Sequence, residues 1–259
     1  MTNFTERAVP TITANFLMQE AVARYVFAKK YISAHKTVLD LACGTGYGSQ
    51  ILLKKSNSYI GIDINDEALS YAQKKYANPN ASFLKMDVND LIFKNHSFES
   101  VVAFEMIEHL ENQHTFLKEV SRVLTPKGVF IVSTPNRLIQ SPNGKLMSPY
   151  HTKEYSPEEF RRLLKKHFSQ VTTYGQRKSK KALQSVNKFM FSQKVRQALV
   201  DIDVLKFRKL LDGDTKEFVW KYVGNLVGRK EQEHVTKSDY IMSKNNLDSA
   251  EYLIALCKK

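Results

Sequence analysis

Short apolar segments alternate with helix-period segments through the first two thirds of the chain. The apolar segments have the length and the Val, Ile, Leu and Phe content of buried strands, and they cover 37–42, 58–63, 82–86, 99–104 and 128–134. Helix-period segments at 65–76 and 114–124 separate them. Alternation of this kind predicts an α/β fold in which a parallel sheet is covered by helices on both faces.

The rest of the chain extends this pattern at both ends. Residues 12–32 predict a first helix, because Leu17, Ala21, Tyr25 and Ala28 recur at helical spacing without Gly or Pro. A further helix is expected from Ser156, which precedes a proline and two acids. Strands are predicted at 170–174 and 251–257. Between them lies a long segment whose first part has helical periodicity.

Composition is that of a soluble globular protein with a strong basic bias. The 259 residues carry a net charge of +13, and residues 177–259 hold 18 Lys and Arg against 10 Asp and Glu. This bias suits an anionic partner such as nucleic acid, an acidic glycan or a membrane surface, and it equally suits a solvated, lysine-rich face. No run reaches the ~18 apolar residues of a membrane span, and the N-terminus lacks a signal-peptide layout. With only Cys43 and Cys257 present, we expect reduced thiols and a cytoplasmic location.

A glycine-rich turn follows the first predicted strand. Gly44 and Gly46 match the start of a dinucleotide-binding fingerprint, but Ser49 stands where its third glycine belongs. Asp40, an acid inside the preceding apolar strand, needs a partner if buried. It suits a positively charged ligand better than a pyrophosphate, and its alternative role is to cap the amides of the turn.

Two more acids follow the next strands along the chain. Asp63 ends the second strand, where a carboxylate can accept from both ribose hydroxyls, and Asp87 follows the third. There Asp87 can accept from an adenine amino group while the Val88 amide meets the ring edge. Ligands of open α/β sheets bind at the carboxyl ends of strands, so three acids at three successive ends predict a nucleoside site.

These motifs together identify a family resemblance. D-L-A-C-G-T-G-Y-G, G-I-D, K-M-D-V, F-E-M-I-E-H-L and L-K-E-V-S-R-V-L-T-P-K-G-V-F-I-V-S-T-P-N-R resemble class I S-adenosylmethionine-dependent methyltransferases of the type 11 group, over about 6–168 and the last strand. The resemblance implies seven strands in the order 3-2-1-4-5-7-6, with strand 7 antiparallel. It also implies S-adenosylmethionine as cofactor, bound by a set of residues comprising Asp40, Ala42, Gly44, Gly46, Asp63, Ile64, Asp87, Val88 and Phe104.

The resemblance also divides the chain. Residues 1–32 are expected to form an N-terminal lid segment, and 33–176 with 250–259 the cofactor-binding core. Residues 177–249 are expected to form a mainly helical, basic insertion that caps the acceptor site or mediates a homodimer.

A second constellation follows the fourth strand. On a helical turn, Glu105, Glu108 and His109 would stand at i, i+3 and i+4 on one face, and His151 comes later, across a loop. Two carboxylates and two imidazoles could bind a divalent cation, Mg²⁺ or Mn²⁺. The pattern is similar to small-RNA 3′-end 2′-O-methyltransferases and to ubiquinone-pathway O-methyltransferases. Without a metal, His109 or His151 could act as a base.

The function expected from these features is O-methylation of a saccharide or other small polyhydroxylated molecule. The alternatives are methylation of an RNA 3′-terminal 2′-hydroxyl and of a catechol or quinone precursor. We expect a small-molecule or glycan acceptor rather than nucleic acid, because no RNA-binding motif or aromatic platform accompanies the basic tract. A cofactor-binding protein without catalysis is a further alternative.

Overall fold

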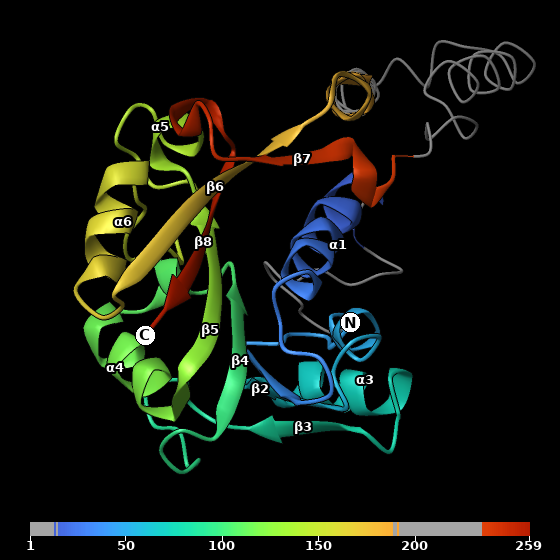
Figure 1. The fold of residues 1–259 in the computed structure, drawn as a ribbon. Helices are drawn as coiled ribbons and strands as arrows, with labels where there is room; N and C mark the ends of the chain where they lie inside the picture. The colour runs from blue at the N-terminus through green and yellow to red at the C-terminus, as the bar shows by residue number, and fades with distance from the viewer. Residues whose placement is uncertain (1–12, 14, 189–190, 192–234) are drawn as a thin grey trace, which may run out of the picture.

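The structure is a computed structural model that describes residues 13, 15–188, 191 and 235–259. Its centre is one eight-stranded sheet with helices on both sides (Figure 1). The strands are β1 (Thr37–Leu41), β2 (Ser58–Asp63), β3 (Ala81–Lys85), β4 (Phe98–Phe104), β5 (Leu124–Pro135), β6 (Gln170–Lys178), β7 (Tyr240–Ser243) and β8 (Tyr252–Lys258). The α-helices are α1 (Asn15–Lys29), α2 (Ser49–Leu52), α3 (Asp66–Lys75), α4 (Gln113–Val123), α5 (Arg137–Gln140) and α6 (Pro157–Lys165). Short 3₁₀ turns lie at Ile107–His109, Lys237–Asp239 and Leu247–Ser249.

The sheet confirms the predicted α/β class and corrects its strand count. Its order is β3-β2-β1-β4-β5-β8-β6-β7, and β1 to β5 are parallel. The last strand, β8, lies antiparallel between β5 and β6, as the family resemblance implied for strand 7. The prediction of seven strands is wrong by one, because β7 adds a further antiparallel strand to the edge of β6.

The described parts of the expected insertion, residues 177–249, overlap the sheet at both ends. Strand β6 continues to Lys178, and residues 180–188 and 191 are α-helical. The segment then holds β7, whose four residues complete the sheet edge. Residues 189–190 and 192–234, where most of the predicted insertion falls, lie outside the described residues, as do residues 1–12 and 14 of the predicted lid segment.

Local sequence signals fix several helix starts. Asn65 caps α3, since its side chain accepts a hydrogen bond from the Ala68 amide. Ser156 and Glu159 form a reciprocal capping box at the start of α6, with Pro157 at the first helical position. The short helix α2 ends at Leu52, and the one-turn helix α5 follows β5.

Two apolar clusters hold the helices to the sheet. One cluster joins the sheet to α4 and α6 through Phe116, Leu117 and Phe160, and the other joins it to α1 and α3 through Tyr25, Phe27 and Leu69. Both thiols, Cys43 and Cys257, are free and buried. None of the helices in the described part of the chain is long and apolar enough to cross a bilayer.

Candidate active site

A cavity of about 590 Å³ lies at the carboxyl ends of β1 to β4, with α1 contributing one wall. The strand register places these four ends side by side, because Leu41 of β1 is opposite Ile62 of β2 and Ala103 of β4. The described residues that line it are Ala21, Arg24, Tyr25, Ala42, Cys43, Gly44, Thr45, Tyr47, Asp63, Ile64, Met86, Asp87, Val88, Asn89, Phe104, Glu105, Met106, His109, Leu110 and Tyr150. Most of the residues predicted to bind the cofactor are among them.

The glycine turn after β1 opens the cavity to a ligand. Gly44 has a φ of +55°, and a Cβ added there would meet nothing within 4 Å, so the backbone can be approached closely. Gly46, with a φ of +78°, does not line the cavity. A Cβ at Gly46 would lie 2.6 Å from the Ala72 side chain, so this glycine serves the packing of the turn against α3. Gly46 thus has a packing role, and its contact with the ligand stays a prediction.

Asp63 links the turn to the end of β2. Its buried carboxylate accepts hydrogen bonds from the Gly44 amide through Oδ2 and from the Asn65 amide through Oδ1, each at 2.9 Å. A carboxylate oxygen can accept more than one hydrogen bond, so Asp63 keeps acceptor capacity toward the cavity that it lines. The neighbouring Ile64 is 65% exposed at the same rim.

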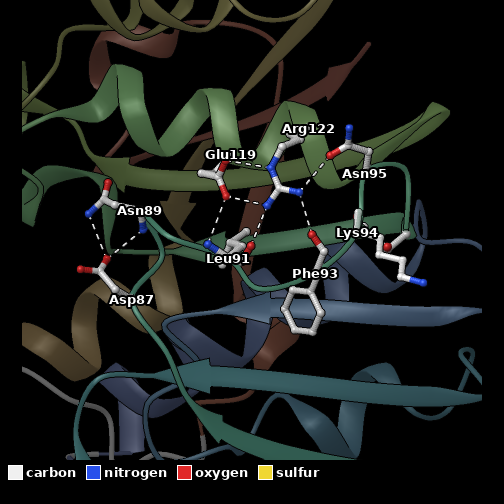
Figure 2. Close-up of polar contacts among 9 residues, drawn as sticks. Asp87, Asn89, Leu91, Phe93, Lys94, Asn95, Glu119 and Arg122 are labelled. Atoms are coloured by element: carbon white, nitrogen blue, oxygen red, sulfur yellow. Dashed lines mark hydrogen bonds and ion pairs between the residues drawn. The ribbon is translucent and has the colours of Figure 1, made fainter.

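The loop that carries Asp87 and Val88 is held to α4 by an arginine. Figure 2 shows Arg122 donating to the carbonyls of Leu91 and Phe93, both at 2.6 Å, while Glu119 accepts from the Leu91 amide. Asp87 itself accepts from the amide and the side chain of Asn89. The network fixes the path of the chain after β3, which positions Asp87 and Val88 on the cavity wall.

Asp40 lies behind the cavity wall. Its carboxylate is fully buried and accepts hydrogen bonds from the hydroxyls of Tyr59 (2.7 Å) and Tyr25 (3.0 Å). Burial raises the pKa of Asp40 to about 7, although both tyrosine hydrogen bonds lower it. Asp40 does not line the cavity, and it holds Tyr25, which does, so its contact with the ligand stays a prediction.

The predicted helical turn carrying Glu105, Glu108 and His109 is also corrected. Glu105 has a φ of +51°, in the left-handed region, and only Ile107–His109 form a 3₁₀ turn. The Glu105 carboxylate accepts from the Ser133 hydroxyl and lies 3.9 Å from Nε of Arg24. Glu105 is therefore not a member of the cluster that the other three predicted ligands form, although its carboxylate lies near that of Glu108.

Glu108, His109 and His151 do come together. One potential ligand atom from each lies within 4.8 Å of the others. Glu108 is fully buried, and its Oε2 accepts from the Thr134 hydroxyl at 3.1 Å. Its Oε1 has no hydrogen-bond partner among the described residues. Burial and the nearby Glu105 carboxylate raise the pKa of Glu108 well above its ordinary value.

Both imidazoles of this cluster are oriented through Nδ1. His109 Nδ1 is 3.1 Å from the Tyr150 carbonyl, which can only accept, so this nitrogen carries the proton. His151 Nδ1 donates to Glu154 Oε1 at 2.7 Å. The rings meet edge to face with centroids 4.8 Å apart. In this tautomer Nε2 is the lone-pair nitrogen of each ring, which is the arrangement found in histidines that bind metals or take up protons.

Several residues of the site were not predicted from the sequence. Arg24 and Tyr25 on α1 line the cavity, and Thr134 and Glu154 support the cluster. Arg24 had one available signal, namely a basic residue in an otherwise apolar stretch of helix. Thr134 and Glu154 had none, since their partners are distant in sequence.

An open, mostly parallel sheet with a cavity at the carboxyl ends of its strands places the protein in the Rossmann-like class. Residues 39–132 match the family model described as a methyltransferase domain. Residues 39–132 are therefore similar to a class I methyltransferase domain of the type 11 group, as the motifs of the chain indicated.

Curated methyltransferases are similar to part of this chain. A probable S-adenosylmethionine-dependent methyltransferase of Mycolicibacterium smegmatis is 36% identical over 132 residues, which is 51% of each chain. A probable phthiotriol/phenolphthiotriol dimycocerosates methyltransferase of Mycobacterium ulcerans is 34% identical over 97 residues, covering 37% of this chain and 38% of that one. The chain thus spans about half the length, or less, of these curated relatives.

A solved structure shares the whole fold. An S-adenosylmethionine-dependent methyltransferase of Thermotoga maritima, described as a possible histamine N-methyltransferase, superposes with a TM-score of 0.58. The alignment covers 94% of this chain and 93% of that one at 16% identity, so the likeness concerns the fold alone.

Proposed function

We propose that this protein is an S-adenosylmethionine-dependent O-methyltransferase acting on a small molecule with two adjacent hydroxyl groups, such as a saccharide. The observation that carries the proposal is the Glu108, His109 and His151 cluster, which borders the nucleoside cavity through His109. Methyl transfer from a sulfonium needs an aligned nucleophile, and a hydroxyl must also lose its proton. The cluster supplies groups for that second requirement.

The cavity residues suit the methyl donor. Asp63 would accept from the ribose hydroxyls, and Asp87 and the Val88 amide would meet the adenine edge. Gly44 leaves room for the ligand next to the backbone of the turn. The named relatives and the matched methyltransferase domain support the same donor.

A divalent metal fits the cluster chemically. Glu108 Oε1 is a buried oxygen without a hydrogen-bond partner in the described part of the chain, and a cation would satisfy it. Glu108 and the Nε2 atoms of His109 and His151 would hold the ion, while Thr134, Glu154 and the Tyr150 carbonyl keep the three side chains in place. When bound, Mg²⁺ or Mn²⁺ would lower the pKa of a hydroxyl that coordinates it. The mixed nitrogen and oxygen donors favour Mn²⁺, because Mg²⁺ prefers oxygen ligands.

A metal-free mechanism uses the same residues differently. The Glu154 carboxylate accepts from His151 Nδ1, which stabilises the protonated imidazole and makes its Nε2 a better base. In that case His151 would take the proton of the acceptor hydroxyl. Removing divalent metals with a chelator distinguishes the two mechanisms, because only the metal-dependent mechanism would lose its activity.

A catechol or quinone precursor is the second candidate acceptor. The cavity wall next to His109 includes Met106, Leu110 and Tyr150, which offer apolar and aromatic surface to a flat ring. Both acceptors present two adjacent oxygens, which could coordinate a metal ion held by the cluster.

An acceptor screen with a radiolabelled methyl donor tests the proposal. Sugars, catechols and RNA with a 3′-terminal diol would each be tried with and without Mn²⁺, and with EDTA. We expect label in a diol or catechol, loss of transfer with EDTA, and recovery with Mn²⁺. Glu108→Gln should abolish the metal response, whereas Glu158→Gln, an exposed change on α6, should not. Transfer to an amine would contradict O-methylation, and transfer that Glu108→Gln leaves intact would contradict the metal-dependent mechanism.

A further inference from the structure

One buried cation faces the nucleoside cavity. Arg24 is the sole Lys or Arg among the described residues that line it, and only 6% of its surface is exposed. We propose that Arg24 binds the α-carboxylate of the methyl donor's amino-acid end and that Glu105 binds its α-ammonium. This inference rests on the donor named in the proposed function. It assigns the positively charged amino group of that donor to Glu105 rather than to Asp40.

The order of the strand ends places the amino-acid pole. Asp87 follows β3, Asp63 ends β2, Gly44 follows β1 and Glu105 follows β4, so these residues lie in a row along one sheet edge. Neighbouring strands are ~4.8 Å apart, which gives the row a length of about 14 Å. With adenine at Asp87 and ribose at Asp63, the part of the ligand beyond the sulfur lies over β4. The residues on the cavity wall there are Glu105 and, from α1, Arg24.

Arg24 is held from behind, and part of its donor capacity is unused. Nη1 donates to Gln176 Oε1 at 3.0 Å, and the guanidinium lies 4.8 Å above the Tyr252 ring. Gln176 is in turn fixed by donating to the Glu20 carbonyl. Nε of Arg24, however, finds no hydrogen-bond acceptor in the described residues. A buried guanidinium with an unpaired N–H is costly unless a ligand supplies the acceptor.

The ion pair between Arg24 and Glu105 is open enough to receive a zwitterion. Nε and Oε1 are 3.9 Å apart, too far for a hydrogen bond. Glu105 receives one hydrogen bond, from Ser133, which leaves lone pairs for an ammonium. An α-amino acid presents a carboxylate and an ammonium side by side, and this pair presents their complements side by side. Asp40 does not line the cavity, and its Oδ2 already accepts hydrogen bonds from both Tyr25 and Tyr59.

Two ligands that differ only at this pole provide the test. S-Adenosylhomocysteine carries the amino-acid end, and 5′-methylthioadenosine keeps the nucleoside and sulfur but lacks it. Calorimetric titrations would compare their Kd values for the unmodified protein and for Arg24→Met, Arg24→Lys and Glu105→Gln. Lys178→Met is the matched control, because Lys178 is a largely buried cation that pairs with Glu20 and does not line the cavity.

We expect Arg24→Met to weaken S-adenosylhomocysteine binding about 30-fold or more, as for loss of a hydrogen bond between charged groups. Binding of 5′-methylthioadenosine should change less than about threefold, which also reports that the variant is folded. Arg24→Lys should recover part of the lost affinity, Glu105→Gln should lose affinity for S-adenosylhomocysteine only, and Lys178→Met should lose none.

Equal losses of affinity for both ligands in Arg24→Met, or no loss for either, would overturn the assignment. If the unmodified protein binds both ligands equally, only this inference fails. If it binds neither, the proposed function fails with it.

Discussion

Replacing Asp40 by asparagine should change how the stability of the protein depends on pH. The Asp40 carboxylate is fully buried, and burial raises its pKa from 3.8 to about 7. In the folded protein Asp40 therefore binds its proton more tightly than in the unfolded chain. Between these two pKa values the folded state holds more protons, so the free energy of unfolding falls as pH rises.

The size of the effect follows from the pKa shift. One pKa unit corresponds to ~1.4 kcal/mol, so the Asp40 contribution declines by about 4 kcal/mol in total from below pH 4 to above pH 7. Between pH 5 and pH 8 the expected decline is about 2–3 kcal/mol. The amide of the Asp40→Asn variant does not ionise, and its carbonyl oxygen can still accept from Tyr25 and Tyr59. From pH 5 to pH 8, the free energy of unfolding of the variant should therefore rise by about 2–3 kcal/mol relative to that of the unmodified protein.

Urea unfolding followed by circular dichroism at pH 5 and pH 8 measures this difference. Only its change with pH is predicted, because the new amide group lacks an acceptor and adds a cost that is independent of pH. Asp248→Asn, on an exposed 3₁₀ turn, is the control and should show no such change. A difference for Asp40→Asn that is the same at both pH values would refute the reasoning from burial.

Three further predictions concern the supports of the site. Glu154→Gln should weaken Mn²⁺ binding about 10- to 100-fold in a calorimetric titration, because it loosens the orientation of His151. Gly46→Ala should lower the free energy of unfolding by more than about 2 kcal/mol, since strain and a clash with α3 combine, whereas Gly44→Ala should cost only ~1 kcal/mol. Arg122→Ala should raise the hydrogen-exchange rate of the Leu91 amide, because the loop after β3 loses its attachment to α4.

Each of these predictions has an outcome that contradicts it. Unchanged Mn²⁺ affinity in Glu154→Gln would show that the His151 orientation does not matter for a metal. Equal costs for the two glycine changes would mean that contact with α3 is irrelevant at Gly46. Exchange at Leu91 that stays slow in Arg122→Ala would place the anchor of that loop elsewhere.

The sequence predicted the features that depend on local chemistry. Buried strands, the Ser156 capping box and the carboxylates at the ends of β2 and β3 are readable because each signal lies within a few neighbouring residues. The left-handed backbone of Glu105 is not readable, since non-glycine residues rarely adopt it and nothing nearby marks it. Because Glu105 has this backbone conformation, the residues expected to form one helical turn form instead a 3₁₀ turn at Ile107–His109.

Other features depend on contacts between distant segments. Whether Asp40 faces a ligand or a tyrosine is decided by the docking of α1, which brings Tyr25 over β1. The same docking carries Arg24 to the cavity and to Gln176, 152 positions away. Strand β7 is only four residues long and forms by pairing with β6, so its own sequence gives a weak signal.

The central claim is that the cavity at the carboxyl ends of β1 to β4 holds the methyl donor. A crystal structure of the protein with S-adenosylhomocysteine tests it most directly. The expected result places the ribose hydroxyls within hydrogen-bonding distance of the Asp63 carboxylate and adenine beside Val88. Folded protein at saturating ligand with this cavity empty, or with the nucleoside bound elsewhere, would contradict the account.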